Sequence, residues 1–265
     1  MINSYDKLPV GKYLEVADLM KQEGLTDIER QTELLAILTD TTADSILDLP
    51  LADYHALAYQ SKFLESDPPK AKGTRVAKSY KLAYYDDGGE RVEFELVPVL
   101  DIRKLTAAQY IDFQTFTKMD GKLAEVLSCL LVPKGRRYCE GYDPAEVQRA
   151  INVSLSITDA LELFAFFFAQ IRELNKGYAN LFEAHIEEGA GGEEDGGAEG
   201  DAGAGGGFAE KWGWTHSVDE VSAATRVSWD EVCRMTVVDF LNTLCYLRDK
   251  REWEKSQMNE WRKRH

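Results

Sequence analysis

The segment "ALELFAFFFAQI", residues 160–171, is apolar nearly all round when it is drawn as a helix. A helix with this pattern is expected to be buried on every side, so it belongs in the centre of a core. We therefore predict a mainly helical protein built around a long helix that starts near Ser156 and reaches about Glu187. The alternative is that these apolar side chains line a binding groove. The predicted core residues are Leu163, Phe166, Phe167 and Ile171.

On the N-terminal side of this segment, helical patterns give way to one pair of strands. Short helices are predicted across the first seventy residues, and Thr26 with Glu29 is spaced as a capping box. The stretches "YKLAYY" and "RVEFEL" then alternate apolar and polar residues around "DDGG" at 86–89, which predicts an antiparallel hairpin within 76–99. Helices resume at Thr106, and "KLAEVLSCLLV" is predicted to be helical as far as Pro133. The fold class is therefore mainly α with a small antiparallel β-hairpin (α+β).

On the C-terminal side, residues 189–207 consist only of Gly, Ala, Glu and Asp. Such side chains cannot fill a core, and glycine is costly to order, so we predict a disordered linker. It would separate an acidic domain at 1–188, with a net charge of −10, from a module at 208–265 with ten acidic and ten basic residues. All five tryptophans lie in that module. The predicted organisation is thus a helical main domain, a flexible linker and a small helical module.

Residues 208–265 are predicted to form three helices. Three pairs of residues have the spacing of helix caps: Ser217 with Glu220, Ser228 with Glu231, and Thr236 with Asp239. The last helix has an apolar stripe that two short helices can cover, made of Phe240, Leu241, Leu244 and Leu247.

Beyond Arg248 this helix carries Trp253, Met258 and Trp261 among charged residues. Trp253 and Trp261 are eight residues apart, which places them roughly on one helical face. Because tryptophan is enriched at interface hot spots, we predict that these three residues bind a partner. Two alternatives stay open: the face folds back on the acidic residues 1–188, or the basic residues simply suit a helix C-terminus.

The motifs of common enzyme sites are missing from the sequence. It contains no phosphate-binding glycine loop, no GxSxG, no HExxH and no Cys/His set with ligand spacing. His55 has no ligand-spaced partner, and the four cysteines form no CxxC pair and are interpreted as reduced thiols. We therefore predict a protein that is not an enzyme, with no catalytic, cofactor-binding or metal-binding residues.

The charge and hydropathy pattern restricts the possible partners. A net charge of −15 argues against general affinity for nucleic acid, because phosphates would be repelled. The N-terminus shows no secretion signal pattern, and the apolar run at 163–169 is too short to span a bilayer. We expect a soluble intracellular protein that binds neither nucleic acid nor membrane.

Several stretches resemble the tail assembly chaperones of long-tailed bacteriophages. They are "LPVGKYLEVADL" near the start, the block "LTAAQYIDFQTFTK", "LVPKGRRYCEGYDPAEV" and "SITDALELFAFFF", and "SWDEVCRMTVVDFLNTLCYLRDKREWEKSQMNEW". The resemblance implies a mostly helical, non-enzymatic protein of the host cytoplasm. It would hold the tape-measure protein soluble, help tail-tube protein to gather on it, and be absent from the finished virion. The alternative is a phage structural or adaptor protein that stays in the virion.

Overall fold

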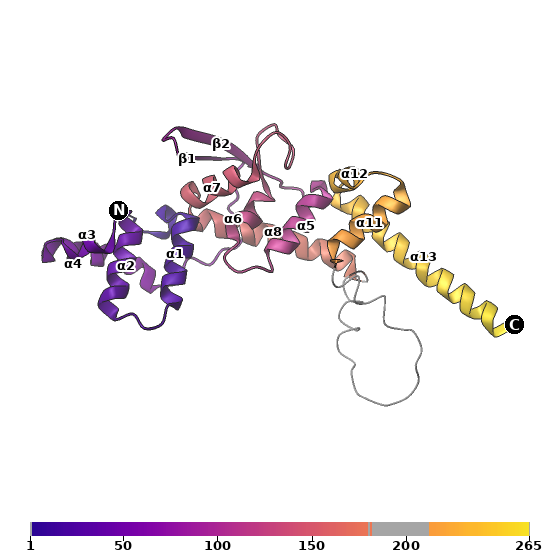
Figure 1. Cartoon of the computed structure of the whole chain (residues 1–265), viewed down its shortest axis with the longest axis horizontal. Coiled ribbons are helices and arrows are strands. Elements are labelled where there is room, and N and C mark those ends of the chain that lie inside the picture. Colours follow the sequence, from indigo (N-terminus) through magenta and orange to yellow (C-terminus); the bar gives the residue numbers. More distant parts are fainter. Residues whose placement is uncertain (1, 180, 182–211, 265) are drawn as a thin grey trace, which may run out of the picture. The chain divides into compact units, whose positions relative to one another are not determined.

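The computed structural model describes residues 2–179, 181 and 212–264, which are mainly helical with one small antiparallel sheet (Figure 1). The predicted fold class is therefore confirmed. The chain divides into two compact units. The first consists of Met1–Leu100 and Asp112–Ala169, and the second consists of Asp101–Ile111 and Gln170–His265. The predicted linker at 189–207 lies outside the described residues, so a domain division at that linker stays a prediction.

The first unit begins with four helices and two short 3-10 turns. The predicted capping box at Thr26 is confirmed, because its backbone N–H donates to Glu29 at 2.8 Å and its hydroxyl accepts from the Glu29 N–H at 3.3 Å. The bounds are η1 Tyr5–Lys7, α1 Val10–Lys21, α2 Asp27–Thr39, α3 Ala43–Leu47, α4 Leu51–Gln60 and η2 Ser61–Glu65.

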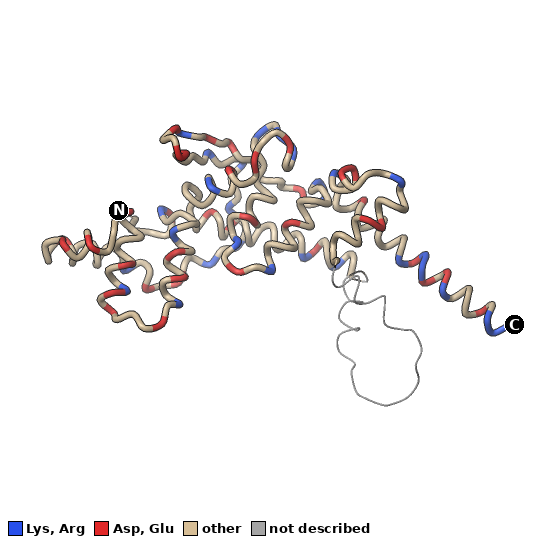
Figure 2. Tube along the Cα trace, in the orientation of Figure 1, with Lys and Arg blue, Asp and Glu red and all other residues tan. Residues whose placement is uncertain are grey.

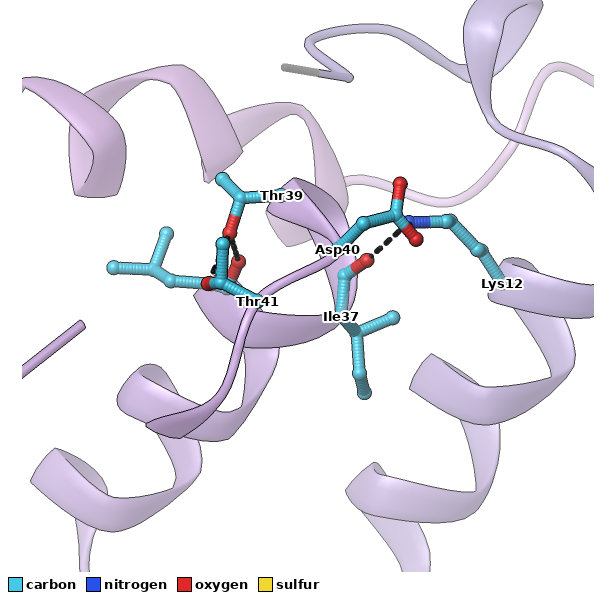
Figure 3. A network of polar contacts seen from close by, with 6 residues as sticks. Lys12, Ile37, Thr39, Asp40 and Thr41 are labelled. Atoms are coloured by element: carbon cyan, nitrogen blue, oxygen red, sulfur yellow. Dashed lines mark hydrogen bonds and ion pairs between the residues drawn. The ribbon is translucent and has the colours of Figure 1, made fainter. Parts of the chain in front are cut away.

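Lys12 connects α1 to the C-terminal end of α2 (Figure 3). Its ammonium group donates to the carbonyl of Ile37 and forms an ion pair with Asp40, both at 2.5 Å. Asp40 ends the helix in the left-handed conformation, with φ 56°. A cation at this position satisfies a terminal carbonyl and suits the helix dipole, so it fixes the packing of α1 on α2.

The sheet has three strands in the order β1-β2-β3, all antiparallel. β1 (Tyr80–Tyr85) and β2 (Arg91–Pro98) form the predicted hairpin, and Tyr80, Leu82 and Tyr84 are buried as the alternation requires. The third strand, β3 (Leu131–Pro133), was not predicted, and the helix expected up to Pro133 is wrong there: α6 ends at Ser128 (Leu123–Ser128). An uninterrupted apolar run is compatible with either a helix or a strand. Here the segment is fully buried, and the pairing of Val132 with Val97 provides its backbone groups with hydrogen-bond partners.

The predicted central helix is α8 (Ile157–Gly177), which follows α7 (Pro144–Ser154). Leu163, Phe167 and Ile171 are at most 3% exposed, as predicted, whereas Phe166 is only half-buried, so its assignment to the core is wrong. This helix is also shorter than predicted, and the end predicted near Glu187 lies outside the described residues. The helix ends at Gly177, where the Tyr178 N–H bonds to the carbonyl three residues back instead of continuing the α pattern.

The loop before β1 is held against α8 by a buried carboxylate. Glu162 accepts hydrogen bonds from the backbone N–H groups of Lys72, Thr74 and Arg75 at 3.2, 3.0 and 3.3 Å. These donors, Lys72 foremost, hold the pKa of the Glu162 carboxyl below its usual range. Gly73 lies between them with φ +67°, and a Cβ there would stand 2.6 Å from the backbone nitrogen of Phe166. Only glycine allows this close approach.

The second unit contains the end of α8 and the start of α5 (Ala107–Phe116), together with η3 (Ile102–Lys104), α11 (Trp214–Thr225), α12 (Trp229–Arg234) and α13 (Val237–Arg264). The caps predicted at Ser228 and Thr236 are confirmed by bonds from the N–H groups three residues on. The cap predicted at Ser217 is wrong, because α11 begins at Trp214 after Gly213. Gly213 has a positive φ of 47°, which starts the helix one turn earlier.

In each unit, a pair of backbone hydrogen bonds joins the residues at the start of one helix to those at the start of another. In the first unit, the Val10 N–H donates to the Leu155 carbonyl at 3.0 Å and the Ile157 N–H to the Leu8 carbonyl at 2.8 Å. In the second, the Ala107 N–H donates to Met235 and the Val237 N–H to Leu105, both at 2.8 Å. Each pair of bonds forms one antiparallel bridge, Pro9 with Ser156 and Thr106 with Thr236.

The sequence repeats along with this geometry. "LPVGKYLEV" at 8–16 corresponds to "LTAAQYIDF" at 105–113, and "LSITD" at 155–159 to "MTVVD" at 235–239. The caps also correspond, since Ser156 accepts from the Asp159 N–H at 3.1 Å and Thr236 from the Asp239 N–H at 3.2 Å. Each unit is therefore organised around a copy of the same bridged helix pair, α1 with α8 and α5 with α13.

Candidate partner-binding surface

Helix α13 has a buried first part and an exposed distal half, Asp249–Arg264. Three residues of the predicted apolar stripe, Phe240, Leu241 and Leu244, are buried, and Leu247 is half-buried. The Trp214 ring of α11 lies 6.3 Å from the Phe240 ring and contributes to this packing. By contrast, all residues of the distal half are exposed, and Figure 1 shows that α13 continues as one helix beyond α11 and α12.

The three predicted partner-binding residues all lie in the distal half. Trp253 and Trp261 are each 63% exposed, and Met258 is 56% exposed. At about 100° per residue, Trp261 is about 80° around the helix from Trp253 and Met258 about 60° further, so the three share one side. We call Trp253, Met258 and Trp261 the distal stripe. It combines aromatic and thioether side chains, which adapt well to the apolar face of a partner helix.

The charges of the distal half leave a basic surplus (Figure 2). Its three glutamates pair with cations of the same helix, at 3.0 Å for Glu252 with Arg248, 3.9 Å for Glu254 with Lys250 and 3.7 Å for Glu260 with Arg264. Within the described residues no ion pair is formed by Lys255, Arg262 or Lys263. The stripe is therefore set among mostly positive charge, which favours an acidic or neutral partner surface.

The base of the distal half is fixed to α11. The Arg251 guanidinium donates to both carboxylate oxygens of Glu220, at 2.6 and 3.4 Å. A forked contact of this kind is stronger and more directional than a single ion pair. It holds the first turn of the distal half in place while Trp253, two residues on, stays exposed.

One buried polar cluster in the first unit has the residue types of an active site. The Tyr138 hydroxyl donates to Asp112 at 2.8 Å and lies 3.7 Å from the sulfur of Cys129. Burial raises the pKa of the Cys129 thiol far above its ordinary value and also raises that of the Asp112 carboxyl. A protonated thiol is a poor nucleophile, so the cluster is better explained as a buried contact that fastens the loop before α7.

Other possible sites in the described part of the chain are no more reactive. A shallow hollow beside the C-terminal end of α2 has Glu15, Glu33 and Asp40 in its lining, and Asp40 already pairs with Lys12. No group of three or more His, Cys, Asp or Glu among the described residues could hold a metal ion. The helices described here include none long and apolar enough to cross a bilayer. The prediction that the protein is not an enzyme stays a prediction.

A second exposed apolar surface, on α4, was not predicted as a site. Leu51 and Tyr59 are 71% and 73% exposed, and with His55 they are spaced by four residues along one side of the helix. We call Leu51, His55 and Tyr59 the α4 row. The sequence feature that could have indicated this surface is the composition of "LADYHALAYQ", which has a single charged residue in ten. Apolar helices are usually interpreted as core, and only the structure shows that this one has no buried residue.

Compared with known proteins, the chain matches no family model and shows no significant similarity to a curated protein or to a solved structure.

Proposed function

We propose that this chain is a non-enzymatic assembly chaperone that holds an apolar helical segment of another protein on the distal stripe. The observation that supports this most directly is the exposure of Trp253 and Trp261 on a helix whose base is fixed by Arg251 and Glu220. Large aromatic side chains that stand in solvent on a rigid element are typical of interface hot spots. A holding function also needs solubility, which the net charge of −15 favours.

The resemblance of the sequence to tail assembly chaperones suggests who the partner is. On this proposal the client is the tape-measure protein of a long-tailed phage, and tail-tube protein gathers on the complex in the host cytoplasm. Tape-measure proteins are long and helical, so their apolar helical faces are the kind of surface that an amphipathic helix covers. The basic surplus around the stripe would select client segments with acidic flanks.

The test is co-expression of the full chain with a tape-measure fragment. Replacing both tryptophans, Trp253→Ala with Trp261→Ala, should leave the protein folded, since both side chains are exposed. Because a hot-spot truncation costs about 2 kcal/mol or more, binding should weaken at least about 30-fold, and the fragment should become insoluble. The soluble fraction of the fragment and the circular dichroism melting curve of the chaperone are measured together.

The matched control is Asn259→Ala, which changes an exposed residue at least about 100° around the same helix from every residue of the stripe. It should keep the fragment soluble. If the tryptophan variant keeps the fragment soluble equally well, the stripe is not the client site. Mass spectrometry of purified virions separates the proposal from the alternative of a structural or adaptor protein, because a chaperone should be missing from the particle.

A further inference from the structure

The α4 row has the composition of an interface rather than of a solvated surface. Of the ten residues of α4 only Asp53 is charged, and the helix has no buried residue. Its inner side, through Tyr54, Leu57 and Ala58, packs on a small cluster of Leu35, Ala36 and Ile46. The outer side presents the α4 row. The centres of protein interfaces contain few charged residues and are enriched in tyrosine. The α4 row likewise has no acidic residue, lysine or arginine, and it includes Tyr59.

Small residues beside the row would let a partner helix come close. Ala52 and Ala56 are both exposed and lie one position beyond Leu51 and His55 along the helix. Because their side chains end at Cβ, they project less from the helix than Leu51 and Tyr59 do. A partner helix with bulky aromatic residues can pack large side chains over such small ones.

The charge around the α4 row is negative on balance. Between Thr39 and Ser61 the chain has four acidic residues and neither lysine nor arginine; the four are Asp40, Asp44, Asp48 and Asp53, of which Asp40 pairs with Lys12. One cation follows directly, since the Lys62 ammonium group lies 5.5 Å from the centre of the Tyr59 ring. The surface that fits the row is therefore an apolar, aromatic helix with basic neighbours. The distal half of α13 has this chemistry, with two exposed tryptophans among six lysines and arginines and four acidic residues.

We propose that the distal stripe of one copy docks on the α4 row of a second copy. This goes beyond the proposed function, because it concerns the protein without a client. Such a contact joins two different surfaces, so it is heterologous and can continue from copy to copy unless it closes on itself. In this arrangement each copy covers the apolar stripe of another, and a client must compete for it.

The test is sedimentation velocity of the full chain over about 1 to about 300 µM, a range suited to a small and weak interface. The wild-type chain should shift from monomer to larger species as its concentration rises. Two variants should each lose this shift: the stripe variant, Trp253→Ala with Trp261→Ala, and the row variant, Leu51→Ser with Tyr59→Ser. Ile28→Ser is the matched control, since Ile28 is 69% exposed on α2 outside both surfaces, and it should associate like the wild type.

Mixing the two variants gives the decisive result. The stripe variant still has an intact α4 row, and the row variant an intact stripe, so an equimolar mixture should form a dimer and nothing larger. A mixture that stays monomeric would overturn the proposal. So would a wild-type chain that is monomeric throughout the range, or a row variant that associates like the wild type. A client-binding test that fails while this mixture dimerises would remove the proposed function and leave this inference standing.

Discussion

Phe167→Ala should lower the free energy of unfolding by about 3–5 kcal/mol, the usual cost of deleting a fully buried phenylalanine. Phe167 has no exposed surface, and its ring stands edge-on to that of Phe166 with centroids 5.1 Å apart. Removing it leaves a cavity inside the central helix packing that the neighbouring side chains cannot close. Urea unfolding followed by circular dichroism measures the change.

The control for this prediction is Phe168→Ala, one residue further along α8. Phe168 is 48% exposed and stacks on Phe164 with centroids 5.6 Å apart, so its loss should cost clearly less. Equal destabilisation by both variants would mean that Phe167 does not occupy the core. It would then favour the alternative in which this face of α8 lines a groove for a partner.

Gly73→Ala should lower the free energy of unfolding by about 2–5 kcal/mol, because two unfavourable effects add. The first is the left-handed backbone, with φ +67°, which disfavours any side chain. The second is contact, since the new Cβ would lie 2.6 Å from the nitrogen and 2.8 Å from the Cα of Phe166. The loop would have to move away from α8 and give up the hydrogen bonds that Glu162 accepts.

Gly89→Ala separates the two effects. Gly89 also has a positive φ, +77°, but a Cβ there meets nothing within 4 Å. Its substitution therefore carries the backbone strain alone, and its thermal unfolding temperature should lie between those of the wild type and of Gly73→Ala. If the two variants melt together, the loop at 72–75 does not pack on α8 as described.

The fold class and most helix starts could be predicted because they depend on local chemistry. Capping residues at Thr26, Ser228 and Thr236 act within four residues of chain, and so does the alternation in β1. The third strand could not be found in this way. Whether the apolar run ending at Pro133 is helix or strand is decided by β2, a segment more than thirty residues earlier.

The bridged helix pairs likewise could not be predicted from local sequence. Their sequence repeat, which starts at Leu8 and again at Leu105, is present in the sequence, but its structural role depends on bridge partners that lie far along the chain, at Leu155 and Met235. For the candidate sites, the sequence placed the distal stripe on an amphipathic helix, and the structure adds that it is exposed. The α4 row could not be predicted, since an apolar helix has the same pattern whether it is buried or exposed.

The central claim, that the distal stripe binds the client, is tested most directly by site-specific photo-cross-linking. A photoreactive amino acid at Gln257 would stand on the stripe side of α13, about 40° from Trp253, whereas one at Asn259 would stand on the opposite side. Both positions are exposed, so neither substitution should disturb the fold. With a co-expressed tape-measure fragment, we expect a cross-linked product from position 257 and none from position 259. Equal products from both positions, or none from 257 while the fragment stays soluble, would contradict the claim.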